Sequence, residues 1–416
     1  MKNLIRVVLP KQYNLVVGDT FQIFYRGVVE APNPYCYDIL SVCEKGRNYP
    51  RYFEFTPEEE GEYDLTISVY SADKTLIGQG ITKLKVSKPK LPQKPLNILC
   101  IGDSLTAGGT WVKEVHRRLC DDGIKDVTFI GTCQKDEVGF EGYGGWEWSN
   151  YTLGSKTPSL WVTCNSDKKV CDQHSLWKDG KGEIWQLETI DIGRLKFNRY
   201  GGHKGERPTG VLTHYQNAVS KTPIEIINTY DEKPNPFYDL EKGEVCLKTY
   251  CEKYGFEGID IVYILLGANG LIGNEKPIPK FCEDVAKKAK TFIDIINRDY
   301  PKVQIRLMTM PVPSVNGGTG ASYGAKLPYC DDYGLAVYTM ELNAAYEKLS
   351  CEYVKTVNIP SQFDSEYNYP CEEKPVNVRS TKTEIVGTNG LHPSDDGYMQ
   401  IADAVYRDVV GTINNL

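Results

Sequence analysis

The segment "LNILCIGDSL" (Leu96–Leu105) decides the fold of the larger part of this chain. Apolar residues fill nearly every position up to Ile101 without alternating with polar ones, which is typical of a parallel strand buried on both faces. A helical pattern follows, because Trp111, Val115 and Leu119 are spaced by four. The segment therefore predicts a strand followed by a helix, the repeating unit of an α/β fold.

The same alternation resumes further along the chain and continues to its end. Apolar runs predict strands, and segments with apolar residues at helical spacing predict helices. Such an order gives a parallel sheet with helices on both faces, a three-layer α/β fold. The predicted strands lie at 127–133, 259–269, 303–313 and 353–361, and the predicted helices at 281–300, 336–352 and 395–413.

The alternation stops between residues 151 and 258. The run "GEIWQLETIDIGRLKFNRY" (182–200) indicates β-structure in this part of the chain. The sequence therefore predicts a large insertion between two strands of the sheet. Insertions of this length in α/β proteins usually build substrate sites.

The first 88 residues have a different pattern. Short β-branched and aromatic runs are separated by Gly, Pro, Asn and Asp, and no helical pattern lies between them. This predicts a small all-β, immunoglobulin-like sandwich domain at 1–88. The Pro- and Lys-rich run "SKPKLPQKP" (87–95) supplies a linker at 89–95. The α/β domain is then expected at 96–416, with the insertion at about 151–258.

Composition excludes several classes of partner. The chain has 416 residues, a net charge of −7 and no Lys/Arg-rich run, so we expect no nucleic-acid partner. No apolar run is long enough for a membrane span. No signal-peptide pattern opens the numbering, so we expect either a cytoplasmic or virion-associated protein, or a secreted one whose leader was removed. The 13 cysteines form no Cys-x-x-Cys pair, which argues against a zinc site and leaves disulfides open.

Polar residues follow several of the predicted strands at their carboxyl ends, where α/β proteins bind ligands. Ser104 in "GDSLT" follows the first strand, and Asn269 in "LLGANG" follows the strand at 259–269. The second strand leads into "FEGYGGWEWSNY", where Gly144 and Gly145 expose backbone N–H groups. His392, followed by a proline, precedes the last helix. Taken singly, a helix cap at Ser104 and an Asn-Gly turn at Asn269 are the competing interpretations.

Together, these four segments resemble the SGNH (GDSL) hydrolase superfamily. "IGDSLT" resembles its nucleophile block, "GYGGW" its glycine block, "GAN" its Gly-x-Asn block and "GLHPS" its histidine block. The resemblance covers residues 96–416 and implies a flavodoxin-like three-layer sheet with serine esterase activity. That chemistry needs neither a metal nor an organic cofactor, and we expect none.

The resemblance also implies a role for each residue. Ser104 would attack an ester carbonyl, and His392 would take its proton and pass it to the leaving alcohol. The N–H groups of Ser104 and Gly145, with the Asn269 side chain, would bind the oxyanion, and Gly144 is the competitor of Gly145. Loss of one such donor typically costs ~3 kcal/mol of barrier.

Two positions depart from the pattern of the superfamily. Asn389 stands where an acid usually lies three residues before the histidine, and Gly270 stands where Gly-x-Asn-Asp is common. Three outcomes follow for His392: a serine–histidine dyad oriented by a backbone carbonyl, which is the favoured one, an acid supplied from elsewhere, or a weak or inactive site. The candidate replacement acids are Asp364, Glu366 and Asp395.

The preferred substrate is a short acyl ester, above all an acetyl ester, on a carbohydrate. Aromatic rings suit the apolar faces of sugars, and Trp146 and Trp148 follow the glycine block. The insertion adds Trp161, Trp177 and Trp185, although such rings can equally form a core. One alternative is a non-catalytic glycan-binding or virion-associated structural protein, and another is a thioesterase or lysophospholipase. The expected partner is a small ester or acylated glycan, and the oligomeric state is left open.

Overall fold

The computed structural model describes residues 4–31, 33–152, 235–239, 242–271, 276–314, 316–323 and 332–416, and the backbone of short strands between 160 and 228. Its contacts divide the chain into two compact units. The first unit combines Met1–Ser149 with Cys251–Leu416, and the second is Asn150–Tyr250. The four segments of the predicted site, which carry Ser104, Gly145, Asn269 and His392, all belong to the first unit.

A seven-stranded sheet forms the centre of the first unit. Its order is β10 (Cys133–Lys135), β11 (Val138–Gly142), β8 (Leu96–Gly102), β21 (Ile261–Leu265), β22 (Gln304–Met308) and β23 (Val354–Val357), with β9 (Val127–Ile130) paired to β8. All pairs are parallel except β10 with β11. Strand β21 is buried at every position, and β8 at all but one, so both faces of the sheet are covered. The predicted mixed α/β fold with a parallel sheet is confirmed.

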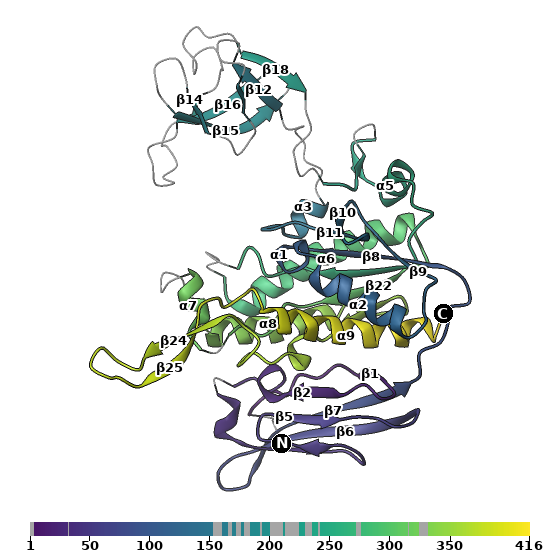
Figure 1. The fold of residues 1–416 in the computed structure, drawn as a ribbon, viewed down its shortest axis with the longest axis vertical. Helices are drawn as coiled ribbons and strands as arrows, with labels where there is room; N and C mark the ends of the chain where they lie inside the picture. The colour runs from purple at the N-terminus through teal and green to yellow at the C-terminus, as the bar shows by residue number, and fades with distance from the viewer. Residues whose placement is uncertain are drawn as a thin grey trace. The chain divides into compact units, whose positions relative to one another are not determined.

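Two pairs of helices pack beside this sheet (Figure 1). The first pair is α2 (Thr110–Asp121) with α9 (Asp395–Ile413), and the second is α6 (Ile278–Asp299) with α8 (Asp332–Glu347). Helix α2 is amphipathic, and Trp111, Val115 and Leu119 are buried on one of its faces, as their spacing predicts.

The segment before α9 carries His392. It follows a hairpin made of β24 (Cys371–Pro375) and β25 (Thr383–Gly387), which projects at the left of Figure 1. Ser394 caps α9, because its side chain accepts the N–H of Gly397 at 3.4 Å. Two aspartates in the first turn complement the helix dipole. The cap that fixes the start of α9 thus lies two residues after the histidine.

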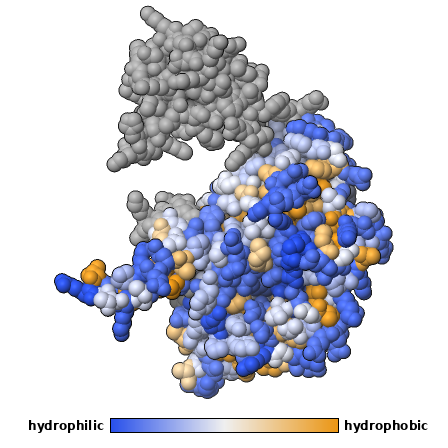
Figure 2. Space-filling model, in the orientation of Figure 1, coloured by the Kyte–Doolittle hydropathy of each residue, from blue (hydrophilic) through white to orange (hydrophobic). Residues whose placement is uncertain are grey.

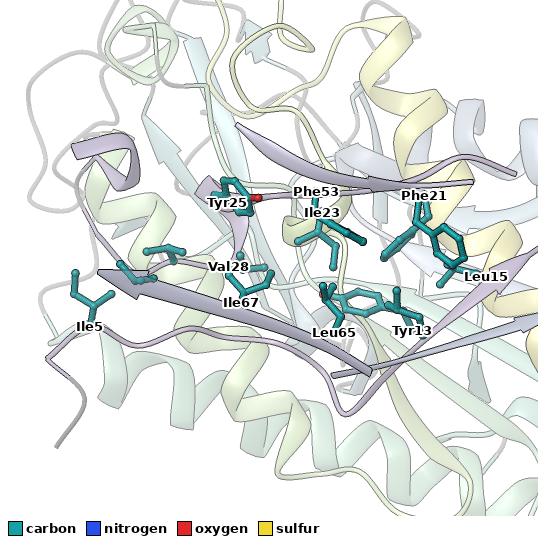
Figure 3. Close-up of a cluster of buried hydrophobic side chains, with 14 of the residues drawn as sticks. Ile5, Tyr13, Leu15, Phe21, Ile23, Tyr25, Val28, Phe53, Leu65 and Ile67 are labelled. Carbon is teal, nitrogen blue, oxygen red and sulfur yellow. The ribbon is translucent and has the colours of Figure 1, made fainter. Parts of the chain in front are cut away.

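Residues 4–87, called here the N-terminal β-region, form two sheets around their own core. One sheet has the order β1-β7-β6-β3 and the other β2-β5-β4. Figure 3 shows Ile23, Phe53 and Tyr25 packed over Leu65 and Ile67, which are all nearly inaccessible to solvent. The immunoglobulin-like assignment and the domain boundaries stay predictions. The strands are β1 (Gln12–Val16), β2 (Phe21–Phe24), β3 (Asp38–Val42), β4 (Arg47–Asn48), β5 (Tyr52–Phe55), β6 (Gly61–Tyr70) and β7 (Leu76–Ser87).

The N-terminal β-region packs directly on α9, and Figure 1 shows β1 beside this helix. Asn14 of β1 donates to Asp408 at 3.3 Å. A Cβ on Gly411 would lie 2.5 Å from the Asn14 side chain, so the close approach requires glycine there. Asp19 accepts from Arg118 of α2 at 2.6 Å and from Arg407 of α9 at 2.5 Å.

The second unit contains short antiparallel sheets. Within the segment 182–200, predicted as β-structure, β15 (Ile184–Asp191) pairs antiparallel with β16 (Arg194–Arg199). A second sheet pairs β12 (Leu160–Cys164) with β13 (Lys169–Cys171) and β18 (Ile224–Asn228). The side chains of Trp161, Trp177 and Trp185 lie outside the described residues.

The described surface in Figure 2 is mostly hydrophilic, and its apolar residues lie in small groups between polar ones. Among the helices of the described residues, none combines the length and apolar character that crossing a membrane requires.

Candidate active site

Ser104 lies at the carboxyl end of β8, as the first residue of a short helix, α1 (Ser104–Ala107). Asp103 is the residue that caps this helix, because its Oδ1 accepts the N–H of Leu105 at 3.0 Å. The cap role that competed for Ser104 in the sequence is therefore filled by its neighbour. The Ser104 side chain is available for another partner.

That partner is His392. Its Nε2 lies 2.9 Å from Oγ of Ser104, although the two residues are 288 positions apart in the chain. The imidazole is half-buried, and this burial lowers its pKa below the ordinary value of 6.5. A neutral imidazole at hydrogen-bond distance from a hydroxyl is the arrangement that proton transfer requires. The structure thus brings together the two side chains on which the sequence prediction depended.

Asn389 holds the backbone of the histidine loop. Its Oδ1 accepts the N–H of Leu391 at 3.0 Å and the N–H of His392 at 2.9 Å. The hydroxyl of Ser322, in α7 (Gly318–Tyr323), also donates to this oxygen at 3.4 Å and accepts the N–H of Gly390 at 3.1 Å. Because Oδ1 serves these donors, the amide nitrogen must face the other way. It lies 3.4 Å from Nδ1 of His392.

This orientation of the amide selects a tautomer of the imidazole. An amide nitrogen only donates, so it favours a His392 ring whose Nδ1 is an acceptor and whose Nε2 carries the proton. In that tautomer Nε2–H donates to Ser104 and cannot take its proton. A carboxylate at position 389 would favour the opposite tautomer. In a serine protease triad, the equivalent acid-to-amide change lowers turnover about 10⁴-fold for this reason.

None of the replacement acids reaches His392. Asp364 and Glu366 instead form ion pairs with Arg51, at 2.9 Å and 3.1 Å. Asp395 is exposed in the first turn of α9. The favoured alternative, a backbone carbonyl on Nδ1, is not what the structure contains either. Within the described ranges, the partner of Nδ1 is the Asn389 side chain.

Asn269 reaches the site from the end of β21, but its amide nitrogen is already engaged. It donates to Oδ2 of Asp103 at 3.2 Å and to the carbonyl of Trp146 at 3.0 Å. Asp103 is almost inaccessible to solvent, and this burial raises the pKa of its carboxyl to about 7. Asn269 thus links the segment of Asp103 and Ser104 to the glycine loop.

The glycine loop lies beside Ser104. An ideal Cβ built on Gly144 would be 4.0 Å from the Cβ of Ser104, whereas one on Gly145 would meet nothing within 4 Å. Gly145 has a φ of +81°, a left-handed conformation that favours glycine. By this measure Gly144, the competitor in the sequence prediction, is the nearer of the two to Ser104.

Trp146 continues the glycine loop as a half-buried ring. It stacks on Tyr143 with ring centroids 4.2 Å apart and an angle of 29° between the planes. The hydroxyl of Tyr143 donates at 2.5 Å to Glu141, a fully buried carboxylate that also accepts the N–H of Thr132 at 2.6 Å. The position of this aromatic pair is therefore set by a buried network.

Trp148 occupies a different environment from the predicted one. Its side chain is 1% exposed, its Nε1–H donates to the hydroxyl of Tyr346 at 2.8 Å, and its ring packs edge-on against Phe292. A ring in this position packs in the core between α6 and α8. The structure therefore corrects the prediction that Trp148 contacts substrate.

Sequence reasoning missed three contributors to the site: Asp103, Ser322 and the carbonyl of Trp146. Asp103 was visible inside "GDSLT", but burial, which gives its carboxyl an unusual pKa, is not a sequence property. Ser322 had no sequence signal. Within the described ranges, no three His, Cys, Asp or Glu side chains are grouped so that they could hold a metal ion.

By sequence, the chain matches no family model and no curated protein. Solved structures similar to it include a carbohydrate esterase family 3 from Talaromyces cellulolyticus, at 11% identity, 77% of this chain, 99% of that chain and a TM-score of 0.37. A family two carbohydrate esterase from Clostridium thermocellum in complex with cellohexaose is 13% identical over 97% of this chain and 95% of that chain, with a TM-score of 0.34. A carbohydrate acetylesterase family member from Sinorhizobium meliloti is 12% identical over 77% and 100%, also with a TM-score of 0.34.

Proposed function

We propose that the protein is a serine esterase that hydrolyses short-chain acyl esters, above all acetyl esters, carried on carbohydrate. The observation that carries this proposal is the 2.9 Å distance between Oγ of Ser104 and Nε2 of His392. The order of the four SGNH-like segments in the sequence supports it.

The reaction needs His392 with its proton on Nδ1. Ser104 Oγ bonds to the acyl carbon while its proton passes to Nε2, and the imidazolium then gives that proton to the leaving alcohol as the C–O bond breaks. Water, activated by the same imidazole, releases the acid from the acyl-enzyme. Because Asn389 favours the other tautomer, turnover proceeds through a minor form of the ring.

The negative charge that develops on the carbonyl oxygen needs donors. The N–H of Ser104 and an N–H of the glycine loop, from Gly145 or the nearer Gly144, would supply two. Asn269 would supply a third if its hydrogen bond to Asp103 or to Trp146 gives way when substrate binds. Hydrogen bonds of unliganded sites often rearrange in this way, so the observed engagement of Asn269 is compatible with the role.

The Tyr143–Trp146 pair supports a sugar as the alcohol part of the substrate. The carbonyl of Trp146 accepts a hydrogen bond from Asn269, and the same amide nitrogen donates to Asp103, the residue before Ser104. A fixed, half-buried aromatic ring offers a flat surface for the apolar face of a pyranose. Trp146 is therefore the residue to which this proposal gives the substrate contact.

Two variants test the proposal. Ser104→Ala and His392→Ala should abolish release of acetate from a chromogenic acetyl ester, with a thermal midpoint close to that of the wild type. A covalent serine probe followed by mass mapping should label Ser104 in the wild type. Labelling elsewhere, or a large fall of the midpoint in either variant, would assign these residues a different role.

The glycan-binding alternative keeps one specific observation in its favour. With the proton on Nε2, the site offers several hydrogen-bond donors but no general base for Ser104. Such a site could hold an acylated glycan without cleaving it. Acetyl-ester cleavage no faster than that of Ser104→Ala, together with measurable binding of an acetylated oligosaccharide, would select this alternative. A thioesterase or lysophospholipase would instead prefer long acyl chains over acetyl.

A further inference from the structure

We propose that the N-terminal β-region is part of the active-site architecture, and that Arg51 is a positioning residue for the loop that carries His392. Arg51 holds the segment 364–370, called here the bracket loop, and the bracket loop holds the histidine loop on both sides. The effect on turnover rests on the proposed function, whereas the effect on the loop does not.

The first link joins Arg51 to the bracket loop. Its guanidinium donates from Nη1 to Oδ1 of Asp364 at 3.0 Å and from Nη2 to Oδ2 at 2.9 Å. Nη1 also reaches Glu366 at 3.1 Å, and the guanidinium carbon lies 4.7 Å from the ring centre of Tyr367. These contacts raise the pKa of Arg51, with Asp364 as the main cause. A two-pronged, partly buried pair of this kind is stronger and better defined than a surface ion pair.

The second link joins the bracket loop to the histidine loop. The N–H of Thr388 donates to the carbonyl of Pro370 at 2.9 Å, four residues before His392. The N–H of Ser394 donates to the carbonyl of Asn368 at 3.0 Å, two residues after it. His392 therefore lies in a short segment whose two ends are both hydrogen-bonded to the same neighbouring loop.

A side chain of α9 ties the bracket loop at its base. Oε1 of Gln400 accepts the N–H of Asp364 at 2.8 Å and the side-chain amide of Asn368 at 2.7 Å. The carbonyl of Asn368 also lies so close to α9 that a Cβ on Gly397 would meet it at 2.5 Å. The loop is thus held by α9 on one side and by Arg51 on the other.

Arg51 can act as a fixed point because the β-region around it is closely docked. A Cβ on Gly27 would lie 1.8 Å from the carbonyl of Pro360, so the two backbones are in direct contact. Tyr13 donates to Ser361 at 2.8 Å in a fully buried contact. The carbonyl of Arg51 accepts the N–H of Tyr25 at 3.0 Å, which anchors its own backbone.

Precision at His392 is what this support would provide. Catalytic groups need to be held within about 0.5 Å of the productive geometry, and misplacement by about 1 Å can cost about 10²-fold in rate. Without Arg51, the bracket loop loses its two-pronged ion pair with the β-region, and the histidine loop samples positions farther from Ser104. Binding of the substrate involves the glycine loop and changes little.

The test compares Arg51→Ala with Arg118→Ala. Arg118 of α2 is a matched control because its ion pair with Asp19 also joins the α/β layer to the β-region. Its second ion pair, with Asp403 of α9, stays within the α/β layer, and it has no contact with the bracket loop. Hydrogen–deuterium exchange of the segment 387–394 reports the loop without any need for activity. Initial rates on a chromogenic acetyl ester give kcat and KM.

We expect Arg51→Ala to speed exchange in 387–394 at least about fivefold and to lower kcat about tenfold with KM nearly unchanged. Arg51→Lys, which keeps the charge but loses the two-pronged geometry, should be intermediate in both measurements. Arg118→Ala should change neither, even if it lowers the thermal midpoint as much.

Unchanged exchange in 387–394 for Arg51→Ala overturns the inference, and so does an equal increase in Arg118→Ala. If Arg51→Ala does not fold, exchange of the segment 387–394 in Arg51→Lys is the deciding measurement, and unchanged exchange there overturns the inference. Faster exchange in the Arg51 variants without acetyl-ester cleavage in any form, wild type included, would refute the proposed esterase and leave the positioning role standing.

Discussion

The side-chain nitrogen of Asn389 lies 3.4 Å from Nδ1 of His392, and the oxygen of the same amide accepts the backbone N–H of His392 at 2.9 Å. One residue thus fixes both the loop and the tautomer of the imidazole. A carboxylate oxygen could accept the backbone N–H groups of the loop equally well. Only the amide favours the tautomer with the proton on Nε2, because its nitrogen donates to Nδ1, whereas a carboxylate would accept from Nδ1–H.

Asn389→Asp should raise kcat for an acetyl ester by at least about tenfold, because the carboxylate can accept from Nδ1–H and leave Nε2 free to take the proton of Ser104. Its other oxygen can still accept the N–H groups of Leu391 and His392. Steady-state kinetics measure the change, and ¹⁵N shifts of the His392 ring should report a move of the proton from Nε2 to Nδ1.

A matched control for this variant is Asn377→Asp. Asn377 lies in the exposed hairpin turn and accepts the N–H of Arg379, so the same change in charge is made away from the site. Kinetics of the control should equal those of the wild type. A loss of activity in Asn389→Asp would mean that the site depends on the amide, and the tautomer explanation would then be wrong.

The pH profile of the wild type should have its acid limb below 6.5. Burial lowers the pKa of His392, so the imidazole stays neutral, and able to act as a base, to a lower pH than an exposed histidine. The profile of kcat/KM for an acetyl ester measures this limb. In Asn389→Asp the limb should move upward, because a carboxylate stabilises the imidazolium. An acid limb above 6.5 in the wild type would contradict this environment for His392.

Asp103 should make the folded protein less stable as the pH rises. The pKa of its carboxyl is about 7 in the folded state and 3.8 as the ordinary value, so the folded state holds the proton more tightly. This contribution is complete below about pH 4 and is lost as the pH passes through about 7, and its full size is on the order of 4 kcal/mol. Thermal midpoints between about pH 4 and pH 8 measure it.

The comparison for Asp103 is Asp103→Asn, which cannot ionise. Relative to this variant, the wild type should lose stability between acidic and neutral pH. Parallel pH dependence in the two proteins would show that the carboxyl is not strained by burial. The variant should also lower esterase activity, because an amide at 103 presents a donor to the Asn269 nitrogen and weakens that contact.

Substitution of Trp146 should affect substrate binding, whereas substitution of Trp148 should affect stability. Trp146→Ala should raise KM for an acetylated oligosaccharide several-fold and leave kcat for a small chromogenic ester almost unchanged, because it removes a sugar platform. Trp148→Phe should cost at least about 1 kcal/mol of stability, because the hydrogen bond to Tyr346 is lost and the smaller ring leaves space in the core, with no change in KM. A higher KM in Trp148→Phe, with no change in Trp146→Ala, would show that Trp148 contacts the substrate and that its burial was misinterpreted.

Local sequence patterns were sufficient to predict the α/β layer. The apolar runs around Cys100 and Ile264 became β8 and β21, and the helical spacing of Val115 and Leu119 became α2. These features depend on side-chain period, which the sequence displays directly. Side-chain directions at the ends of the strands depend on packing instead, and the Trp148 ring is the example that was misplaced.

The sequence by itself determined that a serine, a glycine loop and an asparagine would lie at the carboxyl ends of strands in one parallel sheet, because these ends share an edge, and that a histidine would precede the last helix. Only the tertiary structure decided how these groups use their hydrogen bonds: which way the Asn389 amide faces, what occupies Asn269, and how Arg51 supports the loop of His392. Hydrogen-bond direction and burial arise from atoms that are far apart in the chain. No local pattern encodes them.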